Sequence, residues 1–432
     1  MKRRVAFFFE NGGLAGFDCR EIGKGNPGLG GTAYMFYVVA WLLASRDNGI
    51  EVTLMTTNEG RFPDCLSVVR VESLAVAVRR CRECGIEYLI TKYSDGHRQQ
   101  PTLFATPTGV KLIIWCHNFA SQKMLDFYAK SINVERLICV GREQMDRYRD
   151  HRAFRKSDYI YNCVDTSVVT PQMEALTEQE FNSRAHKVCY IGAVIPAKGL
   201  HLLTAVWRQV LERVPDAELY VMGNGALYGG NPKLGPWDLA EPAYEYKVLA
   251  PVMKDGQLLP SVHLMGIVGG KEKFELLRQA RVGVPNPSGE TETFCISAIE
   301  MQLMGARIAS KRCPGYLDTV RNGRLVETKS ELADCIVSQL QEPTTDYERT
   351  LADIRQRFSL EAVAKDWEEL FLEAIPEGRH LHAILPLANP EFEHKQWKER
   401  LRRWKERCGW LQEVLPTIDR FYEVKRAIER RV

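Results

Sequence analysis

The chain has 432 residues, which at about 100–200 residues per domain predicts two or three domains. Its hydrophobic fraction of 45% and charged fraction of 26% are those of an ordinary soluble globular protein, which excludes a disordered or collagen-like chain. The net charge is only +3, so no nucleic-acid partner is expected. Residues 391–432 hold 12 Lys/Arg and 8 Asp/Glu, so the basic excess lies in this C-terminal tail and the other 390 residues carry a net charge of −1.

Three further features bear on the compartment. No stretch reaches about 18 uncharged apolar residues, so no transmembrane helix is predicted. The apolar run at 5–9 is too short for the core of a signal peptide. The 12 cysteines are scattered and several stand within apolar runs, which is typical of reduced cysteines in a cytosolic protein. We therefore expect a cytoplasmic protein.

The first 150 residues alternate short apolar runs with helical patterns. Strands are predicted at 5–9, 51–55, 88–91, 111–116 and 137–140. Helices are predicted at 32–46, 74–84, 120–130 and 142–149. Apolar strands separated by helices are typical of a parallel sheet that is covered on both faces.

A polar stretch at 166–186 predicts a linker, after which the alternation restarts. Strands are predicted at 188–191, 218–222, 262–265, 282–284 and 307–310, and helices at 199–214, 271–280, 294–304 and 315–322. From about residue 330 the pattern is helical, with helices predicted at 332–340, 347–358 and 359–374, the last with Ser359 as its N-cap. The sequence thus predicts two parallel-sheet domains. Neither carries a dinucleotide-type G-x-G-x-x-G or a P-loop, so simple NAD and P-loop interpretations lose their main support.

Two glycine-containing motifs follow predicted strands. Residues 26–32 read NPGLGGT and precede the long apolar helix, where glycines let backbone N–H groups approach an anion and the helix N-terminus favours negative charge. A flexible loop without a ligand is the alternative. Residues 192–199 read GAVIPAKG, and Lys198 opens the next helix, where a cation opposes the helix dipole. A phosphate partner would explain that lysine; a solvated side chain is the alternative.

A third motif, PNPSGETETFCISAIE at 285–300, predicts a strand end, an acidic turn and a helix start. Ligands of open α/β sheets bind beyond the carboxyl ends of the strands, where this turn must lie. Glu292 and Glu300 differ by about 80° around a helix, so they do not stack on one face. They can hold two ends of an elongated ligand with a phosphate between them. Acidic residues that only favour the helix dipole are the alternative.

Together these motifs resemble family 4 of the GT-B glycosyltransferases. The resemblance rests on the E-x7-E block with MQLMGARIA at 301–309, on residues 190–199, on NCVD at 162–165 and on His117 with Asn118, and it covers about residues 1–375 in order. It implies the GT-B fold, in which two Rossmann-like parallel-sheet domains face each other across a cleft. It also implies glycosyl transfer with retention, from a nucleotide sugar to a glycan or lipid-linked acceptor, with cell-surface polysaccharide biosynthesis as the expected setting. No cofactor and no metal would be needed.

The resemblance further implies a donor site. Gly30 and Gly31 would contact the donor diphosphate through backbone amides, and Lys198 would neutralise it. Further amides would come from the start of the signature helix, at Phe294, Cys295 and Ile296.

The remaining implied roles concern the two sugars of the donor. Glu300 would bind the ribose hydroxyls, and Glu292 would bind the hydroxyls of the transferred sugar. His117 would hydrogen-bond that sugar or stabilise charge near its anomeric carbon. Glu292 and His117 are therefore the predicted catalytic residues.

Two departures from the family pattern motivate alternatives. Ala193 stands where an arginine is common, which removes one of two diphosphate cations unless Lys311, Arg312 or another residue replaces it. Cys295 stands where a glycine is usual. A catalytically degenerate nucleotide-sugar-binding protein is one alternative, and a GT-B-like nucleotide-sugar epimerase or hydrolase is another.

The expected domain division is 1–166 on the acceptor side, 167–186 as the linker, 187–345 for the donor, 346–376 as helices that return to the N-terminal domain, and 377–432 as a basic amphipathic helical tail. Within the donor domain, residues 226–261 are rich in glycine, proline and aromatic residues (Tyr228, Trp237, Tyr244, Tyr246). This stretch is interpreted either as a sugar or acceptor surface or as a structural excursion.

The tail carries a heptad-like seam of apolar residues at spacings of 4, 3, 4, 3 and 4, namely Trp397, Leu401, Trp404, Cys408, Leu411 and Leu415. Its mixed charges favour packing of the seam on the protein itself or in a homodimer. The alternative is peripheral contact with the inner face of the membrane, which tryptophan with basic residues also suits.

Overall fold

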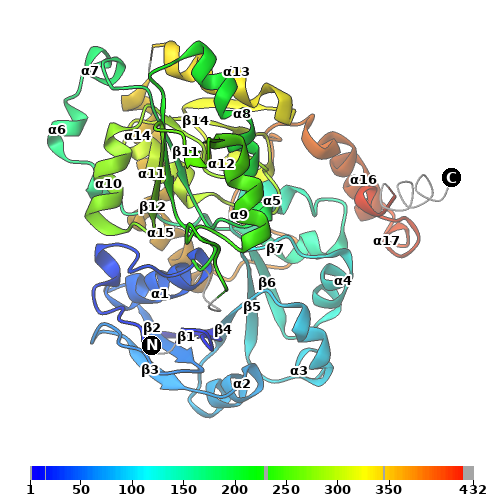
Figure 1. Cartoon of the computed structure of the whole chain (residues 1–432). Coiled ribbons are helices and arrows are strands. Elements are labelled where there is room, and N and C mark those ends of the chain that lie inside the picture. The colour runs from blue at the N-terminus through cyan, green and yellow to red at the C-terminus, as the bar shows by residue number, and fades with distance from the viewer. Residues whose placement is uncertain (1, 15, 228–231, 344–345, 422–432) are drawn as a thin grey trace.

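The computed structural model describes residues 2–14, 16–227, 232–343 and 346–421. Two sheet-centred domains lie against each other, the N-terminal one mainly in blue and cyan and the C-terminal one mainly in green and yellow, and the last helices lie at one side of the molecule (Figure 1). This confirms the predicted α/β fold with two parallel-sheet domains.

In the described part of the N-terminal domain, seven parallel strands form one sheet in the order β3-β2-β1-β4-β5-β6-β7. The strands are β1 (Arg3–Phe9), β2 (Ile50–Thr56), β3 (Ser67–Arg70), β4 (Tyr88–Lys92), β5 (Lys111–Cys116), β6 (Val134–Cys139) and β7 (Ser157–Tyr159). The helices are η1 (Ile22–Lys24), α1 (Gly31–Ala44), α2 (Leu74–Glu83), η2 (Asp95–Gln99), α3 (Pro101–Ala105), α4 (Gln122–Lys130), α5 (Arg142–Asp146) and η3 (Arg152–Lys156). The central strands β1 and β5 are almost wholly buried, which explains their continuous apolar runs.

The C-terminal sheet, over the residues that are described, has six parallel strands in the order β12-β9-β8-β13-β14-β15. They are β8 (Lys187–Ile191), β9 (Glu218–Met222), β12 (Val262–Gly266), β13 (Val282–Gly283), β14 (Arg307–Lys311) and β15 (Gly323–Val326), and β10 (Met253–Lys254) pairs with β11 (Gln257–Leu258) in a separate hairpin. The helices are η5 (Pro196–Lys198), α8 (Leu200–Arg213), α9 (Pro242–Leu249), η6 (Ala250–Val252), α10 (Gly270–Gln279), α11 (Ile296–Leu303), α12 (Pro314–Thr319), η7 (Lys329–Glu331) and α13 (Leu332–Gln341).

The strand order determines where a ligand can bind. In each sheet the order reverses beside the first strand, between β1 and β4 in one domain and between β8 and β13 in the other. Open parallel sheets bind ligands at the carboxyl ends of the strands beside such a reversal. The loops after β1, β8 and β13 are the ones that carry the three sequence motifs.

The sequence pattern missed edge strands. β3 has little buried side-chain surface, and β15 buries only its last residue, Val326. Edge strands pair on one side only and need not be apolar, so their sequences do not show the continuous hydrophobic run that marks β1 or β5.

The stretch predicted as a linker contains short helices. These are η4 (Thr166–Val168), α6 (Pro171–Glu174) and α7 (Glu178–Asn182), of which α7 begins with a capping box formed by Thr177 and Glu180. Met173 and Phe181 are buried, and the Phe181 ring lies 4.5 Å from that of Tyr347, centroid to centroid. The connection between the sheets is therefore anchored, although its sequence is mostly polar.

Two helices after the second sheet, α14 (Tyr347–Phe358) and α15 (Leu360–Leu372), follow the predicted ranges closely. The hydroxyl of Ser359 accepts a hydrogen bond from the Ala362 N–H (3.2 Å), which confirms it as the N-cap of α15. Trp367 of α15 packs against Phe7 and Trp115 of the N-terminal sheet, with ring centroids 5.9 and 4.8 Å apart. The C-terminal part of the chain thus completes the N-terminal core.

The prediction for the C-terminal tail is wrong in one respect. The helices there are η8 (Phe392–His394), α16 (Lys395–Arg407) and α17 (Leu411–Val414), so the seam is interrupted after Arg407. The side of α16 that packs on the N-terminal domain is charged, with Lys395, Lys398, Glu399 and Lys405 buried. Trp397, Trp404 and Cys408 of the predicted seam are exposed. Buried charged residues of α5 and of the turn that follows it, Glu143, Asp146, Arg149 and Asp150, receive this helix.

The stretch at 226–261 is partly structural. Glu245 of α9 is buried and its carboxylate accepts hydrogen bonds from the N–H groups of Trp237 (3.1 Å) and Leu239 (2.9 Å), which fold the preceding loop onto the helix. Tyr244 is buried, whereas Trp237 and Tyr246 are exposed. Tyr228 lies outside the described residues.

Candidate functional site

The motifs from the two domains meet at the cleft between the sheets. A Cβ atom built on Gly31, the first residue of α1, would lie 3.8 Å from Cδ1 of Ile296, the first residue of α11. The N-termini of one helix from each domain therefore approach the same point, with Gly30 and Cys295 as their N-caps. Both helix dipoles favour negative charge there.

Two cavities lie in this cleft, and Ile296 lines both of them. The large cleft cavity has a volume of about 610 Å³. Its described lining is Glu21, Gly23, Lys24, Gly25, Asn26, Pro27, Tyr34, Cys163, Val164, Asp165, Ser167, Val168, Gly270, Lys271, Lys273, Phe274, Ile296 and Glu300. The small cleft cavity, of about 330 Å³, is lined by Gly31, Thr32, His117, Asn118, Asn162, Ile195, Ala197, Lys198, Thr291, Glu292, Thr293, Phe294 and Ile296. An elongated ligand could span both cavities past the two helix N-termini.

Glu292 and Lys198 form an ion pair in the small cleft cavity. The Lys198 ammonium donates to Oε2 of Glu292 at 2.8 Å, and the Asn286 side-chain amide donates to the same oxygen at 2.9 Å. Glu292 is buried, so its carboxylate is held in one position by two donors. The structure thus brings together the predicted phosphate cation and the predicted sugar-binding carboxylate.

Gly199 allows the Lys198 loop to lie this close to the Glu292 loop. Its φ is +69°, in the left-handed region that favours glycine, and it is the N-cap of α8. A Cβ atom there would lie 2.8 Å from the backbone nitrogen of Ser288. The Ser288 hydroxyl, with hydrogen bonds of 2.7 Å to the carbonyl oxygen of Ala197 and to Oδ1 of Asn286, links the two loops.

Glu300 lies on α11 at the large cleft cavity and has its own lysine partner. The Lys273 ammonium from α10 donates to Oε1 of Glu300 at 2.6 Å, and both side chains are mostly buried. Glu292 and Glu300 are therefore held in the same way, each by a lysine that comes from a different element.

His117 follows β5 and borders the small cleft cavity. Burial lowers the pKa of its imidazole to about 3, so the ring is neutral at physiological pH. Its Nε2 atom is buried and, among the described residues, has no hydrogen-bond partner. The nearby Asn162 Oδ1 is in the same condition. Both residues line the small cleft cavity, so this cavity has a ring nitrogen and an amide oxygen at its edge that the described protein groups leave free to hydrogen-bond.

The side chains of Phe294 and Cys295 are both buried and packed against neighbouring residues. The Phe294 ring packs between Tyr161 and Phe358, at centroid distances of 6.0 and 5.5 Å. The Cys295 thiol is buried beside the Ser297 hydroxyl (3.3 Å), burial raises its pKa to about 12, and it does not belong to the described lining of either cavity. The cysteine at the usual glycine position therefore leaves the small cleft cavity open.

The sequence did not single out Lys273 or Asn286. Lys271 and Lys273 stand in the same helix start, GGKEK, and only the fold decides which of them meets Glu300. Arg312, considered as a replacement for the arginine missing at Ala193, instead pairs with Glu327 (2.8 Å) and lies over the Phe392 ring. The signal for Asn286 was its position directly after a buried strand, six residues before Glu292.

No arrangement suited to a metal ion, meaning three or more clustered His, Cys, Asp or Glu side chains, occurs in the part of the chain that the structure describes. The cations that face the cleft carboxylates are lysines.

Comparisons with known proteins address the fold and one domain. Residues 185–342 match the family described as Glycosyl transferases group 1. No curated protein matches the sequence. Among solved structures, HepE of Anabaena in complex with UDP and glucose is 15% identical with a TM-score of 0.60, over 85% of this chain and 99% of HepE.

Two other solved structures show the same likeness. Sucrose-phosphate synthase of Thermosynechococcus elongatus is 16% identical with a TM-score of 0.60, over 86% of this chain and 98% of the synthase. A glycosyltransferase from Rickettsia africae is 12% identical with a TM-score of 0.60, over 86% of this chain and 99% of its own. The chain therefore has the GT-B fold of glycosyltransferases, and its C-terminal domain matches the group 1 family.

Proposed function

We propose that the chain is a retaining glycosyltransferase of family 4 that moves a sugar from a nucleoside-diphosphate sugar to a glycan or lipid-linked acceptor without a metal ion. The observation that carries this proposal is the pair of adjoining cleft cavities, each with one carboxylate held by a lysine, on either side of two converging helix N-termini. The group 1 match of residues 185–342 supports it. Cell-surface polysaccharide biosynthesis is the proposed setting.

In this proposal the large cleft cavity takes the nucleoside and the small one takes the sugar. Glu300 would bind the ribose hydroxyls, and the diphosphate would lie at the N-termini of α1 and α11, near the backbone of Gly30, Gly31 and Ile296. The solved structure of HepE, which has a similar fold, contains UDP and glucose, so UDP-sugars are the first donors to test.

The reaction requires stabilisation of the charge that develops on the leaving diphosphate. Lys198 and the two helix N-termini supply positive potential at that point. When the diphosphate binds, the Lys198 ammonium exchanges part of its contact with Glu292 for the phosphate. The Glu292 carboxylate then becomes available to accept hydrogen bonds from the sugar hydroxyls, so donor binding prepares the catalytic carboxylate.

His117 would bind the same sugar as a neutral group. Because burial holds the imidazole pKa at about 3, the ring offers one N–H donor and one acceptor nitrogen rather than a positive charge. A neutral imidazole can hydrogen-bond a hydroxyl of the sugar without repelling the positive charge that develops at the anomeric carbon.

The first test combines ligand binding and turnover. Thermal shift against UDP, GDP, ADP and their sugars identifies the donor, because a ligand of the folded state raises the unfolding temperature. Turnover of that donor is then measured with and without a glycan acceptor. Acceptor-dependent release of the nucleoside diphosphate is expected; donor-only turnover would favour the epimerase or hydrolase, and binding without turnover would favour the degenerate binding protein.

Replacement of Glu292 by Gln tests the site itself. Loss of a charge-assisted hydrogen bond to the sugar is expected to reduce the transfer rate by about 10- to 100-fold while nucleoside diphosphate still binds. Glu290→Gln in the same turn is the matched control, because Glu290 is exposed and does not line either described cavity. An unchanged transfer rate for Glu292→Gln would contradict the proposed catalytic role.

A further inference from the structure

The C-terminal helix α16 buries charged residues and exposes aromatic ones. Its inner side pairs with buried groups of the N-terminal domain: the Lys395 ammonium binds the Glu143 carboxylate, and Glu399 binds the Arg149 guanidinium at 2.8 Å. Lys405 donates to the carbonyl oxygen of Asp150 at 2.8 Å. These contacts fix the rotation of the helix about its axis. The residues on its opposite side therefore face outward.

The outer face carries tryptophan and arginine in alternation. Trp397, Arg400, Trp404 and Arg407 are spaced by three, four and three residues, which places them along one side of a helix, and all four are exposed. Both tryptophans are 60% exposed, and the Arg400 guanidinium lies 4.8 Å from the Trp397 ring centroid. The helix therefore presents an apolar stripe edged with positive charge.

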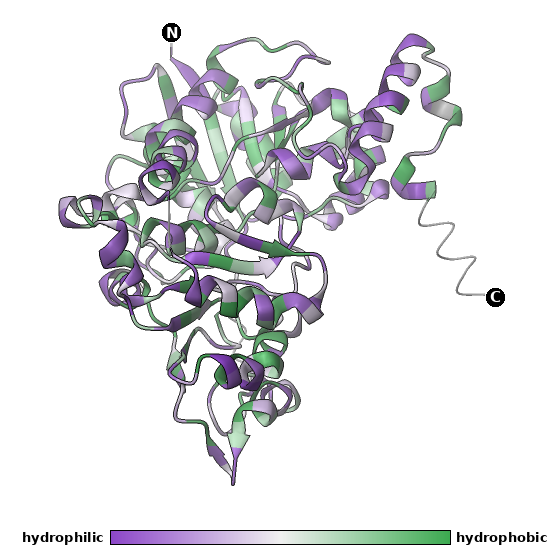
Figure 2. Ribbon diagram, turned by 90° about the horizontal axis from the view of Figure 1, so that it is seen from above, coloured by the Kyte–Doolittle hydropathy of each residue, from purple (hydrophilic) through white to green (hydrophobic). Residues whose placement is uncertain are grey.

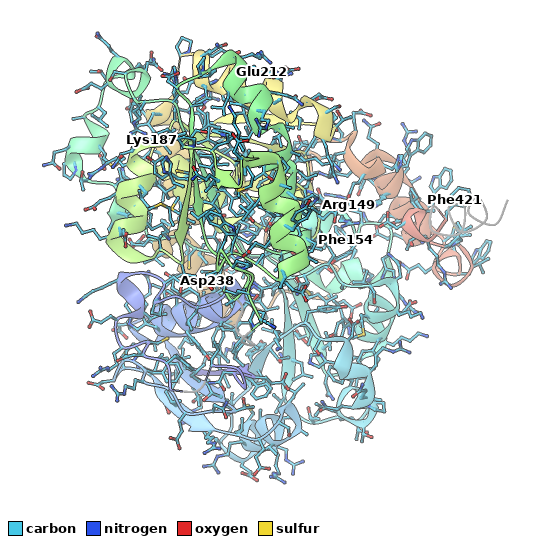
Figure 3. All side chains as sticks on the ribbon, viewed as in Figure 1. Arg149, Phe154, Lys187, Glu212, Asp238 and Phe421 are labelled. Atoms are coloured by element: carbon cyan, nitrogen blue, oxygen red, sulfur yellow. The ribbon has the colours of Figure 1, made fainter. Side chains whose placement is uncertain are left out.

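The same character continues beyond α16. Trp410, at 67% exposed, and Val414 and Phe421 are exposed as well. Figure 2 shows that the C-terminal helices project from the body of the protein with both hydrophobic and hydrophilic residues along them. In Figure 3, Phe421 lies on the outer side of this projection, whereas Arg149 and Phe154 lie on the side toward the body. The surface formed by Trp397, Trp404, Trp410, Val414 and Phe421, together with Arg400 and Arg407, is called the tail face.

Three acidic residues of the described tail are engaged away from this face, and a fourth, Glu406, pairs with Arg402 of α16 itself. Glu393 pairs with Arg147, and Glu399 binds Arg149, Arg402 and Arg403. Asp419 pairs with the buried Lys398 at 2.9 Å. The described part of the tail thus directs tryptophans and arginines outward.

We propose that the tail face docks on the surface of an anionic lipid bilayer. Tryptophan is favoured at the boundary between headgroups and acyl chains, and arginine is attracted to anionic headgroups. Over the described residues, no helix is both long and apolar enough to cross a membrane, so the contact is a peripheral one.

A second copy of the chain fits this face less well. A two-fold contact through the tail face would place the same patch on both subunits, so arginines would approach arginines. An anionic lipid surface is negatively charged and so complements the arginines of the tail face. The docking proposal therefore differs from the homodimer that the seam pattern favoured.

Docking would also orient the enzyme. The tail packs on the N-terminal domain, where Thr417 is hydrogen-bonded to the side chain of Gln122 at the start of α4 (3.0 Å). The N-terminal domain would face the bilayer, and in the proposed function this is the domain that receives the acceptor. The docking itself does not depend on that function, because it is measured as lipid binding without any substrate.

The experiment is flotation of the full chain with vesicles of phosphatidylcholine alone and with vesicles that contain an equal amount of phosphatidylglycerol. The protein is expected to float with the anionic vesicles only, and less so as salt is raised. The variant Trp397→Ser/Trp404→Ser/Trp410→Ser is expected to lose about tenfold or more in partitioning, because the interfacial aromatic contacts are gone. The variant Arg400→Gln/Arg407→Gln should lose the preference for anionic lipid.

The matched control is Tyr246→Ser, which removes an aromatic side chain that is 75% exposed on the C-terminal domain. It is expected to float like the unchanged protein, and circular dichroism confirms that every variant is folded. Three outcomes overturn the proposal: no flotation of the unchanged protein, equal flotation of the triple tryptophan variant, or a dimer in analytical ultracentrifugation that the triple variant abolishes.

Discussion

At the residue scale, the cleft is organised around carboxylates that are neutralised before any ligand binds. Lys198 holds Glu292, and Lys273 holds Glu300. A buried carboxylate without a cation would be costly, so these lysines stabilise the cleft. An anionic ligand that attracts the same lysines changes the hydrogen-bonding capacity of both glutamates. In the proposed function, the two pairs therefore couple the charge of the ligand to the position of Glu292 and Glu300.

Lys273 is expected to contribute to nucleotide affinity. The variant Lys273→Met leaves Glu300 without its cation and removes positive charge from the large cleft cavity, so binding of a nucleoside diphosphate should weaken about tenfold, or about 1.4 kcal/mol. Isothermal titration calorimetry measures this loss. Arg278→Met, on the exposed end of the same helix, is the control. Equal affinities for both variants would mean that Lys273 supports only the structure of the empty cleft.

The buried His117 makes stability depend on pH in a defined direction. Its pKa is about 3 when folded, against about 6.5 when unfolded, so the unfolded chain takes up a proton that the folded protein excludes. Below pH 6.5 this difference lowers the free energy of unfolding by about 1.4 kcal/mol per pH unit, until the folded pKa is approached.

The variant His117→Asn removes this dependence. Urea unfolding at pH 7 and pH 5 should show that the variant loses about 2 kcal/mol less than the unchanged protein between the two values. His97 and His151, which burial also holds at pKa values of about 4, are present in both proteins and cancel in the comparison. A difference of zero would show that His117 takes up its proton in the folded state too.

At the scale of the elements, the sequence predicts those strands and helices whose residues follow one clear hydrophobic pattern. The buried strands β1 and β5 and the helices α14 and α15 follow from apolar runs and helical spacing. The site motifs lie where parallel sheets place strand ends. Edge strand β3 escapes this reasoning because it buries almost nothing, and the Lys273–Glu300 pair escapes it because two helices must be placed before the pair exists.

The tail shows why a correct pattern can predict the wrong face. The apolar spacing in α16 is real, but which stripe is buried depends on the surface that receives the helix. That surface holds Glu143, Asp146 and Arg149, which are buried and ionisable. Buried charges require partners, and Lys395 and Glu399 on the other side of α16 provide them. Complementary charge therefore determines the docking of this helix.

Loss of Lys395 is expected to destabilise the attachment of α16. The variant Lys395→Met leaves Glu143 without its cation, whereas Asp146 keeps Arg149 at 2.9 Å, and breaking such a buried pair costs about 3–5 kcal/mol. Arg407→Met, at the exposed end of the same helix, should change the free energy of unfolding by less than about 0.5 kcal/mol. Urea unfolding followed by circular dichroism measures both.

The loss should grow with pH. Burial, followed by the charge of Asp318, raises the pKa of the Glu143 carboxyl to about 7 even with Lys395 present, and removal of the lysine raises it further. A carboxyl whose pKa is raised in the folded state costs stability as pH rises toward that pKa, because the folded protein must then ionise it. The deficit in the free energy of unfolding of the variant, relative to the unchanged protein, should therefore be larger at pH 8 than at pH 6. An equal deficit at both pH values would show that Glu143 is not the group that Lys395 stabilises.

At the scale of the whole molecule, one hydrophobic cluster joins facing sides of the two sheets, while the opposite side of each sheet packs on a cluster of its own. Phe7 and Trp115 of the N-terminal sheet belong to the same buried cluster as Ile308 of β14. Polar contacts cross the interface too, since Asp318 of α12 accepts a hydrogen bond from the Glu143 N–H (2.8 Å). The Thr293 hydroxyl donates to the His117 carbonyl oxygen at 2.7 Å. The cleft is therefore built from halves that are joined beside it.

Such a shared cluster predicts that the halves unfold together. Trp367→Ala removes a fully buried side chain where α15 packs on Phe7 and Trp115, which should cost about 3–5 kcal/mol. Hydrogen exchange of the backbone amides then reports each half separately, through β5 in the N-terminal domain and β14 in the C-terminal domain. Both strands are expected to lose the same protection, because one global unfolding event exposes them.

Leu372→Ala on the same helix, where the side chain is 48% exposed, is the control and should leave the protection of both strands unchanged within about 0.5 kcal/mol. Loss of protection in β5 alone would show instead that the C-terminal domain keeps its fold when the N-terminal core opens.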